Sequence, residues 1–220
     1  MPKAGETIHS QTFEIGFGGK GSNQAIAASR LGCRTTMIGK VGDDPYGKSY
    51  KEHFEKEGIQ TDYIISDPER PSGVALITVD AKGENTIVVA QGSNGALSPE
   101  DVQRAEQAFE NVEILLMQLE IPLPTVMHAA KLAKRHGKKV ILNPAPAMPL
   151  PAELLGLLYI ITPNKTEAEA LTGVEIKSMD SIKRAAEKLR TKGVANVIIT
   201  LGSEGAFIFN DDGGRLIPTP

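Results

Sequence analysis

Short segments that are almost entirely apolar recur along the chain and predict buried strands. Continuous apolar runs of this kind are typical of parallel sheets with both faces covered. The runs lie at 35–41, 113–119, 138–143, 157–162 and 196–202. Helical patterns separate several of them, and these place apolar residues on one helix face. The faces consist of Val126, Ala129, Ala130 and Ala133 within 123–137, and of Ile182, Ala185, Ala186 and Leu189 within 179–193. Such alternation of strands and helices predicts a three-layer α/β sandwich around a mostly parallel sheet.

A second type of strand alternates between apolar and polar residues. Segments 73–80 and 85–91 alternate and flank Ala-Lys-Gly-Glu, which favours a hairpin turn, and segment 6–17 alternates loosely. Strands of this type have one covered and one wet face, so they do not belong in the middle of a parallel sheet. We expect a small antiparallel β lid, with strands at about 6–17 and 73–91, within one domain that spans residues 1–220. These strands would cover a cleft or pair with another subunit.

Composition narrows the class of protein. With 220 residues and a formal charge of −3, the chain can bury one sizeable core and has no basic excess for nucleic-acid binding. Cys33 is the only cysteine, so no internal disulfide is possible, as suits a reducing cytoplasm. The histidines lack metal-ligand spacing with each other or with Cys33. They are His9, His53, His128 and His136. Because no long apolar stretch or signal-peptide core is present, we expect a cytoplasmic protein with no membrane partner.

The glycine-rich segment 15–32, IGFGGKGSNQAIAASRLG, is the first candidate for a binding site. Gly16, Gly18 and Gly21 match the dinucleotide fingerprint G-x-G-x-x-G, and Asp43 follows at about the separation that a ribose-binding acid needs. That fingerprint follows a wholly buried strand, however, whereas the segment before Gly16 alternates. A P-loop is excluded, because the Gly-Lys pair is followed by glycine instead of serine or threonine.

Two interpretations of this segment remain. In the first, the turn brings backbone amides, Lys20 and Asn23 to the start of a helix, where their donors and acceptors would suit a polyhydroxylated ligand. In the second, the segment is only a tight turn into a closely packed, alanine-rich helix. The segment alone does not choose between them.

Six blocks that follow one another along the chain carry a family resemblance. They are GGKGSNQAIAASRLG, GKVGDDPYG, LMQLEIP, NPAPA, TPNKTEAEALTG and VIITLGSEGAF. Together they closely resemble the ribokinase branch of the phosphofructokinase-B-like sugar kinases, over essentially the whole chain. The resemblance implies an α/β sandwich with a β lid, and transfer of the ATP γ-phosphoryl group to a sugar hydroxyl. D-ribose, giving ribose 5-phosphate, is the first candidate substrate.

The resemblance also implies residues for the sugar. These are Gly19, Lys20, Gly21, Ser22 and Asn23 of the glycine loop, and Glu120 of Gln-Leu-Glu. Ser22 departs from the alanine usual in the family and adds a hydroxyl. Glu120 follows a buried strand, at the edge where open α/β sheets bind ligands; a solvated acid at a strand end is the alternative.

For the nucleotide, the resemblance implies Asn164 and Glu167 of an N-x-x-E motif, acting near the ATP phosphates and Mg²⁺, with Glu167 toward the metal. Without the family, Asn164 would be a helix N-cap and Glu167 its capping-box partner. The resemblance further implies a nucleotide-lining segment that would otherwise be only a turn. It comprises Thr200, Leu201, Gly202, Ser203, Glu204 and Gly205. A monovalent cation is also implied, with its site outside this chain.

Two elements of the family pattern are missing from the sequence. The family base is the aspartate of a Gly-Ala-Gly-Asp motif, expected beyond Pro220, and the family opens with a strand carrying an N-x-D element. We therefore expect a domain incomplete at both ends, with weak or no turnover. Asp43 and Asp44 are the visible carboxylate pair, and we expect them to cap a helix near Pro45. A non-catalytic sugar- or nucleotide-binding fragment is the alternative function. The resemblance and the exposed hairpin predict a homodimer through the lid strands.

Overall fold

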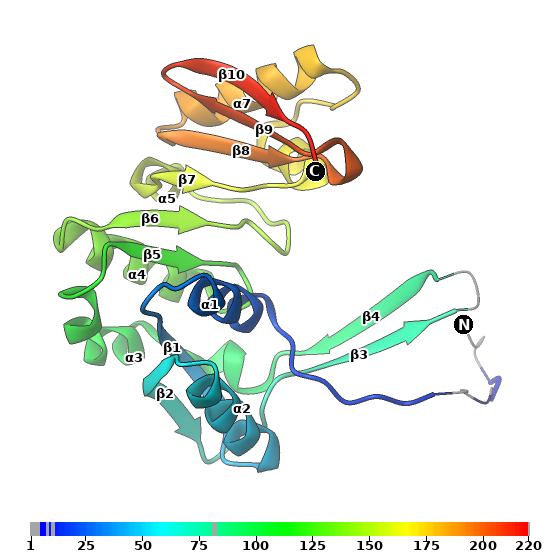
Figure 1. Cartoon of the computed structure of the whole chain (residues 1–220), viewed down its shortest axis with the longest axis vertical. Coiled ribbons are helices and arrows are strands. Elements are labelled where there is room, and N and C mark those ends of the chain that lie inside the picture. The colour runs from blue at the N-terminus through cyan, green and yellow to red at the C-terminus, as the bar shows by residue number, and fades with distance from the viewer. Residues whose placement is uncertain (1–4, 8, 10–11, 81–82, 220) are drawn as a thin grey trace. The chain divides into compact units, whose positions relative to one another are not determined.

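The structure, a computed structural model, describes residues 5–7, 9, 12–80 and 83–219. Its contacts divide the chain into two compact units, Met1–Ala96 and Leu97–Pro220. Both units mix helices and strands (Figure 1). Among the residues that the structure describes, none of the helices has the length and apolar character needed to span a lipid bilayer.

The first unit is built on a parallel βαβ motif. Strands β1 and β2 pair in parallel and helix α2 connects them. A small core joins Ala25 of α1, Phe54 of α2, Ile64 of β2 and Ile59 of the α2–β2 connection. The elements of this unit are α1 (Lys20–Arg30), β1 (Thr36–Gly42), α2 (Pro45–Lys56), β2 (Gln60–Asp67), β3 (Val74–Val79), β4 (Asn85–Ala90) and the 3-10 helix η1 (Gly92–Ala96).

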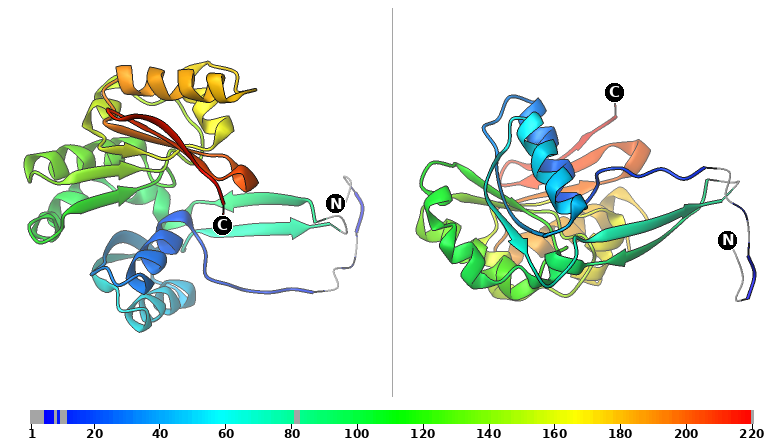
Figure 2. Two further views of the ribbon diagram at one scale, coloured as in Figure 1. Left: turned by 45° about the horizontal axis from the view of Figure 1, so that its top comes forward. Right: turned by 90° about the horizontal axis from the view of Figure 1, so that it is seen from below.

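Strands β3 and β4 form the predicted hairpin, antiparallel from the pair Val74↔Ala90 to the pair Val79↔Asn85. Every residue of both strands is exposed, so the expectation of one covered face is wrong. The reason is visible in Figures 1 and 2, where the hairpin extends away from α1, α2, β1 and β2. Among the described residues of the first unit, no helix or sheet covers either face of the hairpin.

The third lid strand, expected over 6–17, is absent from the described part of that segment. Residues 12–17 form no strand and are all exposed, and residues 8, 10 and 11 lie outside the described residues. Phe13 is 84% exposed and Ile15 is 70% exposed. Loose alternation is therefore not sufficient, because a strand also needs a neighbour to receive its backbone hydrogen bonds.

The second unit contains a six-stranded sheet in the order β10-β9-β8-β7-β6-β5. β5 to β8 are parallel, and β9 and β10 add an antiparallel edge. The elements of this unit are α3 (Pro99–Arg104), η2 (Glu106–Phe109), β5 (Ile114–Met117), α4 (Leu123–Arg135), β6 (Lys139–Leu142), α5 (Ala152–Leu157), β7 (Ile160–Ile161), α6 (Lys165–Thr172), α7 (Met179–Thr191), β8 (Asn196–Thr200), η3 (Gly202–Glu204), β9 (Ala206–Asn210) and β10 (Gly213–Ile217). The predicted class, mixed α/β with a mostly parallel sheet and a small antiparallel one, is confirmed.

The helices of the second unit follow from the strand order. β5 to β8 step across the sheet in one direction, so right-handed crossovers bring their connecting helices to one face. Accordingly α4 packs on β5 and β6, and α7 on β8 and β9. The predicted apolar faces of both helices are buried. The strands, however, are not buried on both faces: Ile114 and Leu116 of β5 are 47% and 40% exposed.

One strand boundary differs clearly from its prediction. The apolar run 157–162 predicts a strand, yet Leu157 ends helix α5 and only Ile160–Ile161 pair as β7. Leu154, Leu155 and Leu158 are all buried, at 0–2% exposure. Their spacing of one, three and four residues fits one face of a helical turn, so packing extends α5 into the run.

Candidate functional site

The glycine loop begins helix α1 in the first unit. Gly19 is its N-cap, with φ 88° and ψ 137°, a backbone conformation that glycine adopts at little cost. Asn23 N–H donates to Gly19 O at 2.9 Å and starts the helical ladder. Because Gly19 has no side chain, the N-cap makes no side-chain hydrogen bond to the first turn, and the first-turn amides can serve a ligand.

Side chains at the start of α1 fall into two groups. Lys20 and Asn23 are exposed. Ser22 is only 6% exposed, and its hydroxyl has no hydrogen-bond partner among the described residues. The Ser22 side chain is therefore buried, whereas the exposed Lys20 and Asn23 can reach a ligand.

The described residues before Gly16 also bear on the dinucleotide interpretation. That interpretation requires such a strand to feed the turn. The described residues before Gly16 are irregular, and Phe13 and Ile15 are largely exposed. The structure therefore gives the fingerprint no support.

Asp44 has the capping role that the sequence predicts. It is the N-cap of α2 and accepts from Gly47 N–H at 2.8 Å, with Pro45 at the first helical position. It also accepts from the N–H and the hydroxyl of Ser72 at 2.7 and 2.8 Å. Burial opposes its ionisation, but these hydrogen bonds outweigh it and hold the pKa of Asp44 below its usual value. Asp43 is exposed, and its carboxylate lies 3.9 Å from the Lys48 ammonium.

In the second unit, several predicted residues gather at one edge of the sheet. Since β5 to β8 are parallel, their carboxyl ends share an edge, where open α/β sheets bind ligands. Glu120 follows β5, Asn164 follows β7 and Thr200 ends β8. Backbone contacts join these segments: Leu119 N–H donates to Ala145 O, and Thr200 N–H to Pro163 O, both at 2.9 Å.

Asn164 and Glu167 form the capping box that their spacing predicts. Asn164 Oδ1 accepts from Glu167 N–H, and Glu167 Oε2 accepts from Asn164 N–H, each at 2.8 Å. Asn164 is exposed and Glu167 is 8% exposed. The pair thus fixes the N-terminus of α6, where amides and the helix dipole favour an anion.

The segment from Thr200 to Gly205 turns tightly beside that helix. Leu201 N–H donates to Gly205 O at 2.8 Å, and Lys165 Nζ lies 2.5 Å from Glu204 Oε1. Gly205 has φ 97°, and a Cβ there would lie 2.0 Å from Ile217 O. The Leu201 side chain is 4% exposed and belongs to the core, so only its backbone can meet a nucleotide. Gly202, Ser203 and Glu204 are exposed.

Asn143 is a residue of this edge to which the sequence assigned no role. It directly follows β6, and its Nδ2 donates to Thr162 O at 2.9 Å and contacts Thr162 Oγ1 at 3.3 Å. The side chain thereby ties the end of β6 to the end of β7. The sequence feature that could have identified Asn143 is its position, since it is a polar amide immediately after a buried strand.

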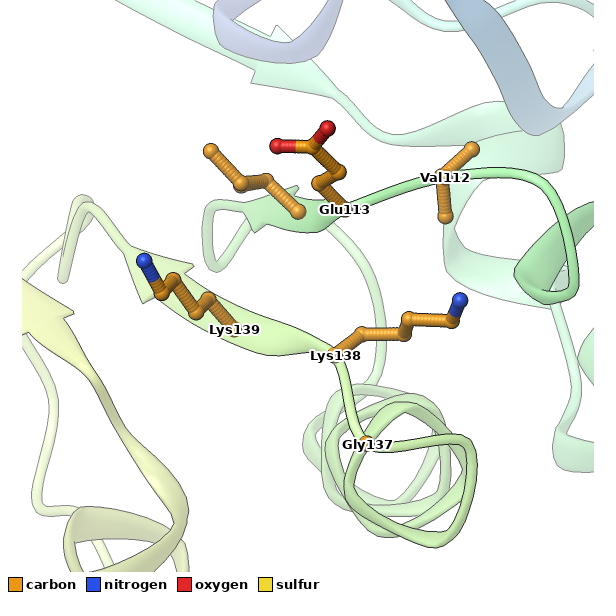
Figure 3. A pocket seen from close by; sticks show the side chains of 6 residues that line it. Val112, Glu113, Gly137, Lys138 and Lys139 are labelled. Carbon is orange, nitrogen blue, oxygen red and sulfur yellow. The ribbon is translucent and has the colours of Figure 1, made fainter.

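A separate hollow lies at the opposite ends of the strands (Figure 3). Its lining includes Ile114 and Lys139, the first residues of β5 and β6. Figure 3 shows the side chains of Lys138, just before β6, and of Lys139, its first residue, pointing in different directions. Lys138 Nζ donates to Glu110 O at 2.9 Å, and Lys139 Nζ lies 4.7 Å from the centroid of the Tyr159 ring. These contacts account for both ammonium groups, so the hollow is not part of the candidate site.

Metal ligands are sparse. Among the described residues, no group of three or more histidine, cysteine, aspartate or glutamate side chains could hold a metal ion. A magnesium ion here would need oxygen ligands from elsewhere, such as nucleotide phosphates and water.

Comparison with known proteins finds relatives along nearly the whole chain. A ribokinase of Haemophilus influenzae is 46% identical over 215 residues, which are 98% of this chain and 70% of that protein. A deoxyribokinase of Salmonella typhimurium is 42% identical, over 96% of this chain and 70% of its own length.

Solved structures agree as well. The structure of Arabidopsis thaliana ribokinase complexed with ribose and ATP matches with a TM-score of 0.92 and 33% identity. The match covers 99% of this chain and 72% of that one. The family profile described as pfkB family carbohydrate kinase matches residues 1–220. The chain therefore belongs to the pfkB family of carbohydrate kinases.

Proposed function

We propose that this chain binds a sugar and ATP as part of an ATP-dependent sugar kinase, with D-ribose as the first candidate substrate. The observation that carries the proposal is the 46% identity to a ribokinase along 98% of the chain. It is supported by the gathering of Glu120, Asn164 and Thr200 at the carboxyl edge of one parallel sheet. The deoxyribokinase relative makes 2-deoxy-D-ribose the second sugar to test.

For the sugar, we propose candidate contacts in each unit taken by itself: the start of α1 in the first unit, and Glu120 in the second. Lys20 and Asn23 are exposed there and supply donors and an acceptor for hydroxyl groups. Gly19, Gly21 and Ser22 would contribute backbone groups, because the Ser22 side chain is buried. Glu120, half-buried beyond β5, would accept from a sugar hydroxyl.

For the nucleotide, we propose the N-terminus of α6 together with segment 200–205. The capping box presents the amides of α6, and the exposed backbone at Gly202–Glu204 lies in the adjoining turn. Glu167 fits Mg²⁺ by donor chemistry: it is a carboxylate with one oxygen held by Asn164 N–H and a second to accept from water of the metal shell. When bound, Mg²⁺ would neutralise phosphate charge during phosphoryl transfer.

Neither visible aspartate near the glycine loop suits the role of base. Asp44 accepts three hydrogen bonds and has a lowered pKa, so it is a poor proton acceptor. Asp43 is exposed and faces Lys48. The Gly-Ala-Gly-Asp motif that supplies the base in the family does not occur in these 220 residues. We therefore propose that the chain binds both substrates with weak or no turnover.

We further propose a homodimer through the hairpin. Leu76, Ile77, Val79, Val88 and Val89 are each 59–65% exposed on it. An apolar hairpin with open edges invites pairing with another copy, which would cover these side chains and satisfy edge backbone groups. A cytoplasmic location is part of the same proposal, since ATP is consumed there and the one cysteine is a free thiol.

The decisive experiment separates binding from turnover. ADP release from ATP and Mg²⁺ is measured with and without D-ribose, and binding of D-ribose and of 2-deoxy-D-ribose is measured by calorimetry. We expect saturable D-ribose binding that Asn23→Ala abolishes and that Asn111→Ala, at an exposed turn outside the site, leaves intact.

Each outcome has a distinct meaning. Sugar binding without ADP release supports the binding function alone, and ribose-dependent release establishes the kinase and contradicts the proposed lack of turnover. Absence of sugar binding together with saturable NAD binding would reject the proposal in favour of a dinucleotide site.

A further inference from the structure

Helix α2 contacts the glycine loop through a tyrosine that the proposed site does not include. The Tyr50 hydroxyl accepts from Gly18 N–H at 2.8 Å and donates to Gly18 O at 3.2 Å. One side-chain oxygen thus holds both backbone polar groups of the same residue. Because those groups belong to the peptide units on either side of Gly18, the contact restrains the chain immediately before Gly19.

The Tyr50 ring is itself anchored. It is half-buried and packs against the core of Ala25, Phe54, Ile59 and Ile64, with its centroid 6.0 Å from that of Phe54. The hydroxyl at its tip therefore has a position set by the core of the first unit, 32 residues away in sequence from Gly18. The packing around α2 therefore fixes the position of Gly18 in the loop.

A second set of contacts from α2 holds the preceding residue. The Phe17 ring stacks on His53, with centroids 4.1 Å apart and planes at 7°, and meets the Tyr50 ring edge-on at 5.0 Å and 79°. Phe17 is nevertheless 48% exposed, so the core of the unit alone does not fix it. Aromatic contacts of these two geometries are favourable beyond the area that they bury.

The far end of α1 is held from the same side. Ser29 Oγ donates to Glu57 O at 2.6 Å, and the Arg30 guanidinium pairs with the Glu57 carboxylate at 2.5 and 2.7 Å. Glu57 is the C-cap residue of α2. Helix α2 and its cap therefore hold the C-terminal end of α1 and the two residues, Phe17 and Gly18, that lead into its first turn.

The residues before α1 include two glycines, whose backbones are costly to order. Gly18 and Gly19 are adjacent glycines, which lose more backbone freedom on ordering than other residues, and Gly19 must hold φ 88°. If the stretch were unrestrained, a ligand would have to order it on binding, at a cost in affinity. With Tyr50 in place, that ordering precedes the ligand.

We propose that Tyr50 is a positioning residue for the sugar loop Gly19–Asn23, holding Gly18 so that the first turn of α1 is preorganised for the sugar. This inference rests on the proposed function for its ligand. It assigns Tyr50 no contact with the sugar: it acts only through Gly18.

The test compares two single-atom deletions on the same helix. Tyr50→Phe removes the hydroxyl and keeps the ring. Tyr46→Phe removes the same atom from a tyrosine that is 49% exposed and is the control. Amide hydrogen exchange of Gly18–Asn23 is followed by NMR, D-ribose and ATP binding by calorimetry, and the fold by circular dichroism. Phe17→Leu, which keeps the hydroxyl and removes the stacking, provides a second variant should Tyr50→Phe fail to fold.

We expect Tyr50→Phe to speed amide exchange in the loop and to weaken D-ribose binding about five- to tenfold, the effect of losing a net hydrogen bond or slightly more. ATP binding should be unchanged, and Tyr46→Phe should match the wild type in every measurement. Unchanged exchange in Tyr50→Phe would show that the hydroxyl does not order the loop. Faster exchange with unchanged D-ribose affinity would show that the order does not serve the sugar.

D-ribose binding by the wild type tests the proposed function, and the comparison with Tyr50→Phe tests the role of Tyr50. If the wild type binds no D-ribose, the proposed function is rejected and the link to the sugar falls with it, while the exchange data still decide whether Tyr50 orders the loop. If the wild type binds D-ribose and Tyr50→Phe binds it equally well, only the inference is rejected.

Discussion

Ser22→Ala should stabilise the protein, although Ser22 lies in the predicted sugar loop. The residue is 6% exposed in the first turns of α1, and its hydroxyl has no hydrogen-bond partner among the described residues. A buried hydroxyl without a partner costs about 1–3 kcal/mol. Alanine removes that cost and also favours the helix by roughly 0.5 kcal/mol.

A small void left by the oxygen offsets part of this gain. We therefore expect Ser22→Ala to raise the free energy of unfolding by about 1–2 kcal/mol, or Tm by roughly 2–8 °C for a chain of this size. Urea unfolding and calorimetry measure both quantities. D-ribose affinity should not change, because the side chain is buried and the proposed contacts use exposed groups.

Ser93→Ala is the matched control in the same unit. Ser93 is 1% exposed, and its hydroxyl donates to Lys40 O at 3.0 Å. Removing that donor should lower the free energy of unfolding by about 1 kcal/mol. If Ser22→Ala is destabilising like the control, the Ser22 hydroxyl has a partner and the reasoning fails. A more stable variant that loses D-ribose affinity would instead make the hydroxyl a sugar ligand.

Three further predictions concern capping, backbone conformation and association. The carboxylate of Asp44 has a folded-state pKa below the unfolded value of about 3.9, so its stabilisation is present above that pH and is lost as pH falls through the folded pKa. Urea midpoints of wild type and Asp44→Asn should thus converge on acidification, and a constant gap down to the lowest pH would contradict this. Gly205→Ala should lower the free energy of unfolding by more than about 2 kcal/mol, through backbone strain and overlap of the new Cβ with its neighbours. Gly202→Ala, with φ 63° and nothing within 4 Å of the added Cβ, should lower it by only about 1–2 kcal/mol. Equal losses in the two variants would refute the overlap at Gly205. Val88→Lys on the hairpin should shift light-scattering mass toward the monomer, and Leu31→Lys, at 84% exposure, should not.

Patterns with a clear period were sufficient for much of the fold. The apolar faces of α4 and α7 are buried as the 3.6-residue period predicts, because one contiguous stripe on each helix meets the sheet. Local chemistry also sufficed for helix starts. Asp44 before Pro45 and the Asn164–Glu167 pair form the caps that their spacing predicts, since those hydrogen bonds close within four residues.

Predictions failed where the outcome depended on a distant neighbour. Segment 6–17 alternates like a strand, yet its described residues have no strand to pair with. Strand β2, Gln60–Asp67, is not predicted, because it opens with three polar residues and forms through pairing with β1. Apolar strands imply two covered faces, but β5 leaves Ile114 and Leu116 about half exposed.

For the candidate site too, residues marked by local sequence were predictable and contacts between distant residues were not. Glu120, Asn164 and Thr200 were accessible to sequence reasoning, because each stands at the end of an apolar run and parallel strands align those ends. Contacts across the fold were not accessible. Asn143 meets Thr162 over 19 residues and Tyr50 meets Gly18 over 32, and no spacing rule connects either pair.

Because the hairpin is exposed, its stability should depend on the protein concentration at which it is measured. Two strands without a covering layer are marginally stable by themselves in water. Whatever covers β3 and β4 therefore contributes to their folding free energy, and by mass action that contribution grows with the concentration of the covering species. If the cover is a second copy, the hairpin will be more ordered at micromolar than at nanomolar protein. Diluting the protein should then destabilise β3 and β4 and leave the other elements unaffected.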